Sequence, residues 1–249
     1  MNSSIQCRGR PLENKIMESD LSKVPPLGAV LFDIDGTLGI SDPFHHKAWS
    51  EVLQKVGFNG GVPITVEFGM KNMAGRTNEQ IGQFLFPDWD QDQLNKLVQE
   101  KEALFECSAR QHLKEINGLH KFCKWIEEKG LKRAAVTNAP RYNAELMISI
   151  LGLSEFFPFI VTGEECGREK PFPDPYLEGL RKLNASPDHT LVFEDSLTGV
   201  KAGVAAGMQV IGVAAVGQEK SLAEAGAILC IRDYEDEKLW SALEKLNAC

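Results

Sequence analysis

The fold is decided by the stretch AVLFDIDGT at residues 29–37. Its first four residues form a short apolar run, which predicts a buried strand. Asp33 and Asp35 follow at once, and because side chains two residues apart leave an extended chain on the same side, their carboxylates converge. Two such groups repel each other unless they share a cation, and Mg²⁺ prefers oxygen ligands. Asp-x-Asp-Gly is also a turn and calcium-loop pattern, but no Glu follows at the spacing that a calcium loop needs.

Strands and helices alternate in the second half of the chain. After Gly118, short apolar runs separate segments with helical periodicity. We expect helices over residues 119–129, 141–151, 175–183, 197–206, 221–225 and 235–246, and strands over residues 132–137, 159–161, 190–193, 209–213 and 227–230. Together with the first strand, this alternation predicts an α/β fold with a Rossmann-like, doubly wound parallel sheet as its core.

A helical segment separates the first strand from this alternating half. It contains helical patterns with many polar residues at 44–56, 78–86 and 91–109, and no clear strand interrupts them. We therefore divide the chain into a flexible tail (1–24), a Rossmann-like core (25–40 and 113–249) and an inserted α-helical cap domain (41–112). An insertion after the first strand is expected over the carboxyl ends of the strands, where such sheets bind ligands, and it can act as a lid.

Composition and charge exclude several classes of function. The chain has 249 residues, of which 43% are hydrophobic and 25% charged, as in folded globular proteins. Lys and Arg total 27 and Asp and Glu total 35, so the net charge is −8, and no basic patch favours nucleic acid. No apolar run is long enough for a membrane span, and residues 1–24 lack a secretory signal. Six scattered cysteines indicate a reducing compartment. We expect a cytoplasmic monomer that binds neither nucleic acid nor membranes, with organelle targeting left open.

Polar residues follow three further segments of the predicted core. Thr137 and Asn138 come at the end of the second predicted strand, and Glu194 and Asp195 end another. Lys170 directly precedes Pro171 and Pro173, in a loop whose backbone has little freedom. Each has an ordinary alternative: helix capping by Thr137, Asn138, Asp195 or the serine that follows it, and a solvated loop lysine. However, ligands bind at these strand ends, and buried carboxylates are costly unless they are paired or metal-bound.

In this order, the motifs resemble those of the haloacid dehalogenase-like (HAD) hydrolase superfamily, in the group with a helical cap inserted after the first motif. The resemblance covers residues 28–232. Within the superfamily the chain is most similar to β-phosphoglucomutases and to small sugar-phosphate phosphatases, including the broad-range plant enzymes. The supporting segments are Ser41-Asp42-Pro43-Phe44-His45, Gly75-Arg76, Lys170-Pro171 and Pro173-Asp174-Pro175-Tyr176. The chain departs from its relatives at Ile40, where they often carry Asp, and at Phe172, where they carry a small residue.

The resemblance implies a role for each of these residues. Asp33 is the nucleophile that takes the phosphoryl group as an aspartyl-phosphate. Asp35 is the acid that protonates the leaving alkoxide and then the base that activates water. Mg²⁺ is held by Asp33, the backbone carbonyl of Asp35 and Asp195, with Glu194 in a supporting position. The phosphoryl oxygens are bound by Thr137, Asn138 and Lys170.

Three cap residues match positions that face the substrate in relatives, namely His45, Arg76 and Lys101. Each has an ordinary alternative, as a surface helix residue, a loop charge or part of a solvated helix face. The sequence therefore predicts a Mg²⁺-dependent phosphatase of small sugar phosphates. A phosphosugar mutase with the same residues is the alternative enzyme. A phosphoester-binding regulator without turnover is the alternative outside catalysis, but a pure binder has no need of Asp35.

Overall fold

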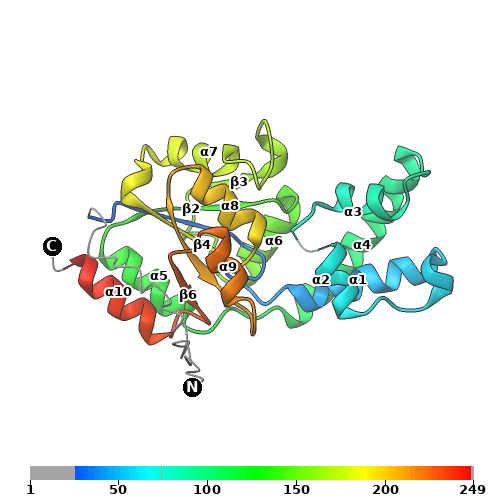
Figure 1. Ribbon diagram of the computed structural model, residues 1–249, viewed down its shortest axis with the longest axis horizontal. Coiled ribbons are helices and arrows are strands. Elements are labelled where there is room, and N and C mark those ends of the chain that lie inside the picture. The colour runs from blue at the N-terminus through cyan, green and yellow to red at the C-terminus, as the bar shows by residue number, and fades with distance from the viewer. Residues whose placement is uncertain (1–25, 74, 248–249) are drawn as a thin grey trace, which may run out of the picture.

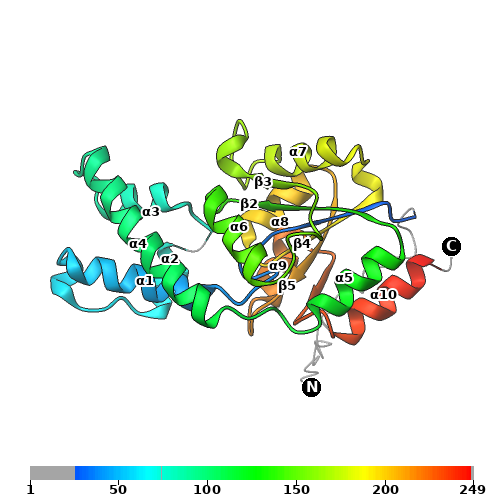
Figure 2. The ribbon, with the colours of Figure 1, turned by 180° about the vertical axis from the view of Figure 1, so that it is seen from behind.

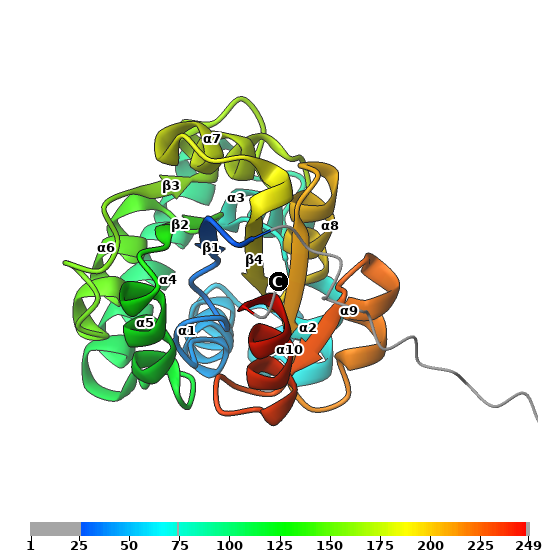
Figure 3. The same cartoon turned by 90° about the vertical axis from the view of Figure 1, so that its left-hand side faces the viewer.

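The computed structural model describes residues 26–73 and 75–247, so the predicted tail at 1–24 lies outside the described residues. Within them, a parallel sheet has six strands in the order β3-β2-β1-β4-β5-β6 (Figures 1 and 3). The strands are β1 (Ala29–Phe32), β2 (Lys132–Thr137), β3 (Ile160–Thr162), β4 (Thr190–Glu194), β5 (Gln209–Val213) and β6 (Leu229–Ile231). This order is that of a doubly wound Rossmann-like sheet, and the predicted fold class is confirmed.

Helices cover both faces of the sheet (Figures 1 and 2). One face packs against α5 (Leu119–Glu128), α6 (Arg141–Ile150) and α10 (Glu237–Asn247), and the other against α7 (Asp174–Leu183), α8 (Leu197–Ala205) and α9 (Glu219–Ala225). The central strand β1 is buried on both sides, since Val30 and Phe32 belong to one hydrophobic cluster and Ala29 and Leu31 to the other. A continuous apolar run is typical of a parallel strand between two helical layers.

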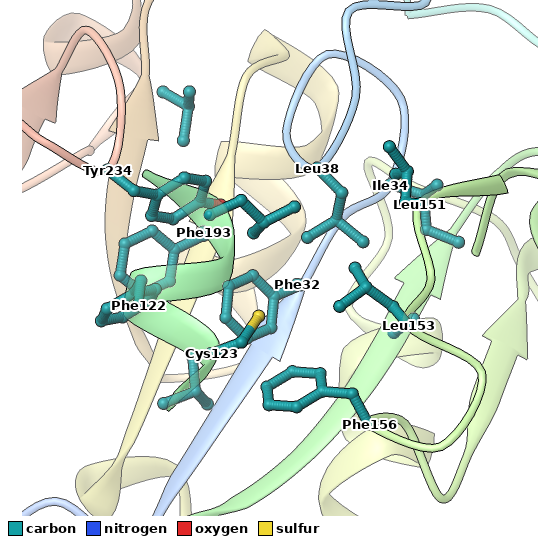
Figure 4. Packing of buried hydrophobic residues seen from close by; sticks show 14 of the residues in the cluster. Phe32, Ile34, Leu38, Phe122, Cys123, Leu151, Leu153, Phe156, Phe193 and Tyr234 are labelled. Carbon is teal, nitrogen blue, oxygen red and sulfur yellow. The ribbon is translucent and has the colours of Figure 1, made fainter. Parts of the chain in front are cut away.

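Aromatic rings fill the core beneath the strand ends (Figure 4). The ring of Phe32 stacks on that of Phe193 with centroids 5.3 Å apart and meets the ring of Phe122 edge-on at 6.0 Å. Aromatic pairs in these geometries contribute beyond the area that they bury. Because Phe32 and Phe193 immediately precede Asp33 and Glu194, this packing fixes the strand ends that carry the acids.

The segment between β1 and β2 is helical and lies off the carboxyl ends of the strands (Figure 1). It comprises α1 (Asp42–Lys55), the 3₁₀ turn η2 (Phe58–Gly61), α2 (Val66–Asn72), α3 (Asn78–Leu85) and α4 (Gln91–His112). Its own apolar cluster includes Trp49, Val52 and Leu97. Helices α3 and α4 begin with capping boxes at Thr77 and Asp90. The sequence predicts no separate helix at α2, because no apolar periodicity marks this segment. The structure explains the missing signal, since none of the residues of α2 is buried.

Small differences at the ends of elements have local causes. The last strand, β6, begins at Leu229 rather than at 227, because the Ala227 N–H donates to the Leu222 carbonyl at 3.0 Å and closes the end of α9. Two short 3₁₀ turns, η3 (Gly163–Glu165) and η4 (Pro187–His189), complete the core. In the part of the chain that the structure describes, no helix has the length and apolar character needed to cross a bilayer.

Candidate active site

The two central strands bring Asp33 and Glu194 to the same level at the edge of the sheet. Strands β1 and β4 pair in parallel with Phe32 beside Phe193, so the residues that follow leave the sheet side by side. The Asp33 N–H donates to the Phe193 carbonyl at 3.0 Å and extends the pairing by one residue. The register therefore explains why acids that are distant in sequence share one site.

Lys170 joins these two acids. Its ammonium donates to Asp33 Oδ1 at 2.8 Å, to the Val136 carbonyl at 2.8 Å and to Glu194 Oε1 at 2.7 Å. Burial alone would lower the pKa of Lys170, but the two carboxylates raise it to about 12. The ammonium is therefore charged at neutral pH. The alternative of a solvated loop lysine is wrong, because the side chain is only 2% exposed.

Both oxygens of Glu194 are occupied by protein donors. Oε1 accepts from Lys170 and from the Tyr176 hydroxyl at 2.9 Å, while Oε2 accepts from the backbone N–H and the hydroxyl of Ser196 at 3.1 and 3.0 Å. Ser196 also caps α8, because its Oγ accepts from the Gly199 N–H at 3.0 Å. Glu194 thus acts as a counter-charge that holds Lys170, and its part in holding a metal stays a prediction.

Asp33, Glu194 and Asp195 form an acidic cluster with one oxygen of each within 4.8 Å of the others. Among the described residues, no cation or hydrogen-bond donor contacts the Asp195 carboxylate. Burial and the charges of Asp33 and Glu194 raise its pKa well above the usual range, and burial raises the pKa of Asp33 to about 8 despite Lys170. A Cβ on Gly36 would lie 2.0 Å from Asp195 Oδ2, so the turn after Asp33 passes close to this carboxylate. The cluster fits an oxygen-loving divalent cation, which would offset the cost of burying these charges.

Asp35 has different partners from Asp33. Its Oδ1 accepts from Ser41 Oγ at 2.8 Å and from His45 Nε2 at 2.8 Å. Burial raises the pKa of Asp35, but His45, the Ser41 hydroxyl and the charge of Lys101 lower it, and the net pKa lies below its usual value. Two carboxylates that are two residues apart thus have distinct environments, as separate roles for a nucleophile and an acid–base group require.

His45 is held from behind by Lys101. Lys101 Nζ lies 2.9 Å from His45 Nδ1. Because an ammonium only donates, Nδ1 accepts, and Nε2–H donates to Asp35. The imidazole stacks on the ring of Phe105 with centroids 4.0 Å apart. Lys101 is 1% exposed, so the alternative of a solvated helix face is wrong. Both cap residues belong to one hydrogen-bonded chain that ends on Asp35, and their contact with substrate stays a prediction.

The other predicted binding residues, Thr137, Asn138 and Arg76, differ in how close they lie to the acidic cluster. Thr137 is buried, and its Oγ1 accepts from the backbone N–H two residues further on at 2.9 Å. Asn138 binds the backbone of Lys170: Nδ2 donates to its carbonyl at 3.1 Å and Oδ1 accepts from its N–H at 3.0 Å. Asn138 therefore fixes the loop that carries Lys170. Arg76 is exposed in the cap, with its guanidinium carbon 4.5 Å from the centroid of the Phe84 ring. Substrate binding by all three stays a prediction.

Sequence reasoning did not assign roles to several side chains that position these groups. Ser41 and Tyr176 lie in segments that carry the family resemblance, so a signal for them existed. Phe105, Glu102 and Asn143 lie in helical patterns without any motif. Only the packing of helices against one another identifies their partners.

The site and the fold together define a class of protein, and the chain belongs to it: the haloacid dehalogenase-like hydrolase family, whose model matches residues 30–213. The chain is 30% identical over 213 residues to "Phosphorylated carbohydrates phosphatase" of Thermotoga maritima, covering 83% of this chain and 95% of that protein. Solved structures are also similar. A family IA, variant 3 HAD hydrolase of Entamoeba histolytica has a TM-score of 0.78 at 26% identity, covering 89% of this chain and all of that one. A Thermotoga maritima protein provisionally named a β-phosphoglucomutase has a TM-score of 0.70 at 29% identity, covering 88% and 99%.

These comparisons confirm the family resemblance that the motifs predict. The matched residues contain β1 from its second residue, the whole helical insertion and β5. They include the acidic cluster of Asp33, Glu194 and Asp195. The site described above therefore lies within the part of the chain that defines the family.

Proposed function

We propose that this phosphoric monoester hydrolase removes the phosphoryl group from small sugar phosphates through an aspartyl-phosphate on Asp33. One observation carries the proposal: Asp33 is buried against Lys170 in an acidic cluster, while Asp35 beside it has separate partners. The relative named as a phosphatase of phosphorylated carbohydrates supports the substrate class. A regulator without turnover has no use for two carboxylates in such different environments.

In the first step, Asp33 attacks phosphorus with Oδ2, because Oδ1 is held by Lys170. The bond from phosphorus to the sugar oxygen breaks, and its electron pair leaves with that oxygen. Lys170 offsets the repulsion between the carboxylate and the anionic substrate, and the Thr137 hydroxyl donates its hydrogen to a phosphoryl oxygen. When bound by Asp33, Asp195 and the backbone carbonyl of Asp35, Mg²⁺ supplies positive charge for the phosphoryl oxygens.

Asp35 moves the proton in both steps. Its protonated carboxyl first gives the proton to the leaving alkoxide. The resulting carboxylate then takes a proton from the water that attacks phospho-Asp33, which frees Asp33 and releases inorganic phosphate. Ser41 and His45 bind Oδ1 and so leave Oδ2 to exchange the proton. The lowered pKa of Asp35 favours its ionised form, which is the form that accepts a proton from water in the second step.

The cap at 41–112 supplies contacts to the sugar. It approaches the core loops near Lys170, since Gln80 Nε2 donates to Glu169 Oε1 at 2.5 Å. A Cβ on Gly75 would lie 2.9 Å from Thr198 Oγ1 at the start of α8. Among the described residues, the neighbouring Arg76 has no carboxylate partner, which suits it to bind an anionic substrate.

A phosphate-release assay over hexose, pentose and polyol phosphates, with Mg²⁺ and with a chelator, tests the proposal. Several substrates should release phosphate, and only with the metal. Conversion of a hexose 1-phosphate to its 6-phosphate without release would favour the mutase. Undiminished turnover after exhaustive chelation would exclude the metal role.

A second experiment tests the covalent mechanism. In Asp35→Asn, an aryl phosphate should still phosphorylate Asp33, and slow water attack should let mass spectrometry detect the added phosphoryl group on the peptide that contains Asp33. A label on another residue would exclude the covalent mechanism.

A further inference from the structure

Glu102, on helix α4 of the cap, joins three groups from three different elements. Its Oε1 accepts from Lys101 Nζ at 2.8 Å and from Asn78 Nδ2, on α3, at 2.5 Å. Its Oε2 accepts from Asn143 Nδ2. Asn143 lies on α6 of the core and is 2% exposed. Glu102 is therefore the point at which the chain of bonds behind Asp35 crosses from the cap to the core.

The bond between Lys101 and Glu102 is unusual, because adjacent residues on a helix do not face each other. The Lys101 ammonium turns away from solvent, lying 5.2 Å from the centroid of the Phe105 ring and 5.9 Å from that of Trp49. A buried ammonium needs a counter-charge, and Glu102 supplies it. The position of Glu102 therefore determines where Lys101 can donate to His45.

On the basis of the proposed phosphatase function, we propose that Glu102 and Asn143 are positioning residues that couple the seating of the cap on the core to the orientation of Asp35. The hydrogen-bonded chain runs from Asn143 through Glu102, Lys101 and His45 to Asp35. When Asn143 holds Glu102, the Lys101 ammonium lies against His45 Nδ1, and the imidazole presents Nε2–H to Asp35. Without that contact, the carboxyl that delivers the proton loses the support of the imidazole.

The same two helices offer a matched control. The Tyr142 hydroxyl on α6 donates to Glu106 Oε1 on α4 at 2.6 Å. Glu106 lies one helical turn beyond Glu102 and does not contact Lys101. Tyr142→Phe thus removes a hydrogen bond between the cap and the core without touching the chain to Asp35. A purely structural role of this contact region would make Tyr142→Phe and Asn143→Ala behave alike.

The test compares kcat/KM of Asn143→Ala, Glu102→Gln and Tyr142→Phe with that of the wild type, on a hexose phosphate and on p-nitrophenyl phosphate. This ratio covers every step up to departure of the leaving group, and p-nitrophenolate needs little protonation. Proton donation is worth about 10²–10⁴-fold, so partial loss of its positioning should lower the value for the hexose phosphate by about tenfold. The value for the aryl phosphate should fall by less than about threefold, and Tyr142→Phe should leave the ratio between the two substrates unchanged.

Equal losses on both substrates, or the same selectivity in Tyr142→Phe, would overturn the positioning role. Thermal melts establish which variants fold. If Asn143→Ala does not fold, the kinetics of Glu102→Gln alone decide, because this substitution changes the same contact from its cap side. A wild-type protein that releases no phosphate from any hexose phosphate would instead refute the proposed function, so the two failures are distinguishable.

Discussion

Lys170→Met removes the cation that joins two buried acids. The ammonium donates to Asp33 and Glu194, whose side chains are 10% and 0% exposed. Methionine has a similar length but no charge, so the Glu194 carboxylate loses its counter-charge and Asp33 loses a hydrogen-bond donor. Removing one partner of a buried ion pair costs about 3–5 kcal/mol. Tyr176 and Ser196 still bind Glu194, so we expect the lower part of this range, about 3 kcal/mol at pH 7 in metal-free buffer.

The loss should increase with pH. Burial raises the pKa of Asp33 to about 8, and Lys170 is the largest influence that lowers it, so the pKa of Asp33 must be higher in the variant. A carboxyl whose pKa is raised by folding stabilises the protein at low pH, and this stability is lost as pH rises through the folded pKa. The unfavourable ionisation of Asp33 begins near pH 8 in the wild type. Above that pH, Asp33 is ionised in the wild type but still protonated in the variant. The difference in stability should therefore widen by up to about 1.4 kcal/mol per pH unit.

Urea unfolding at pH 7 and pH 9, both with a chelator, measures these differences as changes in the free energy of unfolding. Lys201→Met is a matched control, because Lys201 is exposed on α8 and should change stability by no more than about 0.5 kcal/mol. A Lys170→Met protein within about 1 kcal/mol of the wild type at pH 7 would refute the reasoning from buried ion pairs. If the difference in free energy of unfolding between Lys170→Met and the wild type narrows with rising pH, the raised pKa assigned to Asp33 is refuted.

Asp33→Asn should lower turnover by several orders of magnitude with an unchanged circular dichroism spectrum, and near-normal phosphate release would exclude Asp33 as the nucleophile. Asp195→Asn removes a carboxylate that has no protein partner among the described residues, so the melting temperature of the variant in chelator should rise while stabilisation by Mg²⁺ disappears; a wild-type Mg²⁺ shift would contradict the metal assignment. Gly199→Ala places a methyl group 1.6 Å from Glu194 Oε1 and should cost more than about 2 kcal/mol in urea unfolding, so a change near zero would be evidence against this packing. Arg76→Ala should raise KM for sugar phosphates more than it lowers kcat, and unchanged kinetics would remove Arg76 from substrate binding.

The sequence predicts the part of the site that depends on strand order. Asp33 and Glu194 each follow a continuous apolar run, and parallel strands end at the same edge of a sheet. Alternation of strands and helices is enough to bring these two residues together. The prolines that follow Lys170 also mark it as a residue whose backbone has little freedom. These signals are local, so a single sequence contains them.

The cap side of the site depends on contacts between helices whose partners no local pattern identifies. Lys101 lies between Glu100 and Glu102, a charge pattern typical of a solvated helix face, yet it is buried between Trp49 and Phe105. Its burial results from the packing of α4 against α1, which lies about 50 residues earlier in the chain. Lys101 lies on the same row of α4 as the buried residues Leu97 and Phe105, so periodicity marks this face as buried but does not identify α1 as the partner.

The two acids are two residues apart, yet their environments come from different parts of the molecule. Asp33 is held by Lys170, a core residue, and a movement of the cap leaves that bond in place. Asp35 is held by Ser41 and His45, at the start of the first cap helix, so a movement of the cap carries its partners away. In the proposed mechanism, the nucleophile is therefore held by the core and the proton carrier by the cap. An alkyl phosphate needs both, because its alkoxide leaves slowly without a proton. On this proposal, the cap controls whether attack by Asp33 is productive, although it contributes no partner to Asp33 itself.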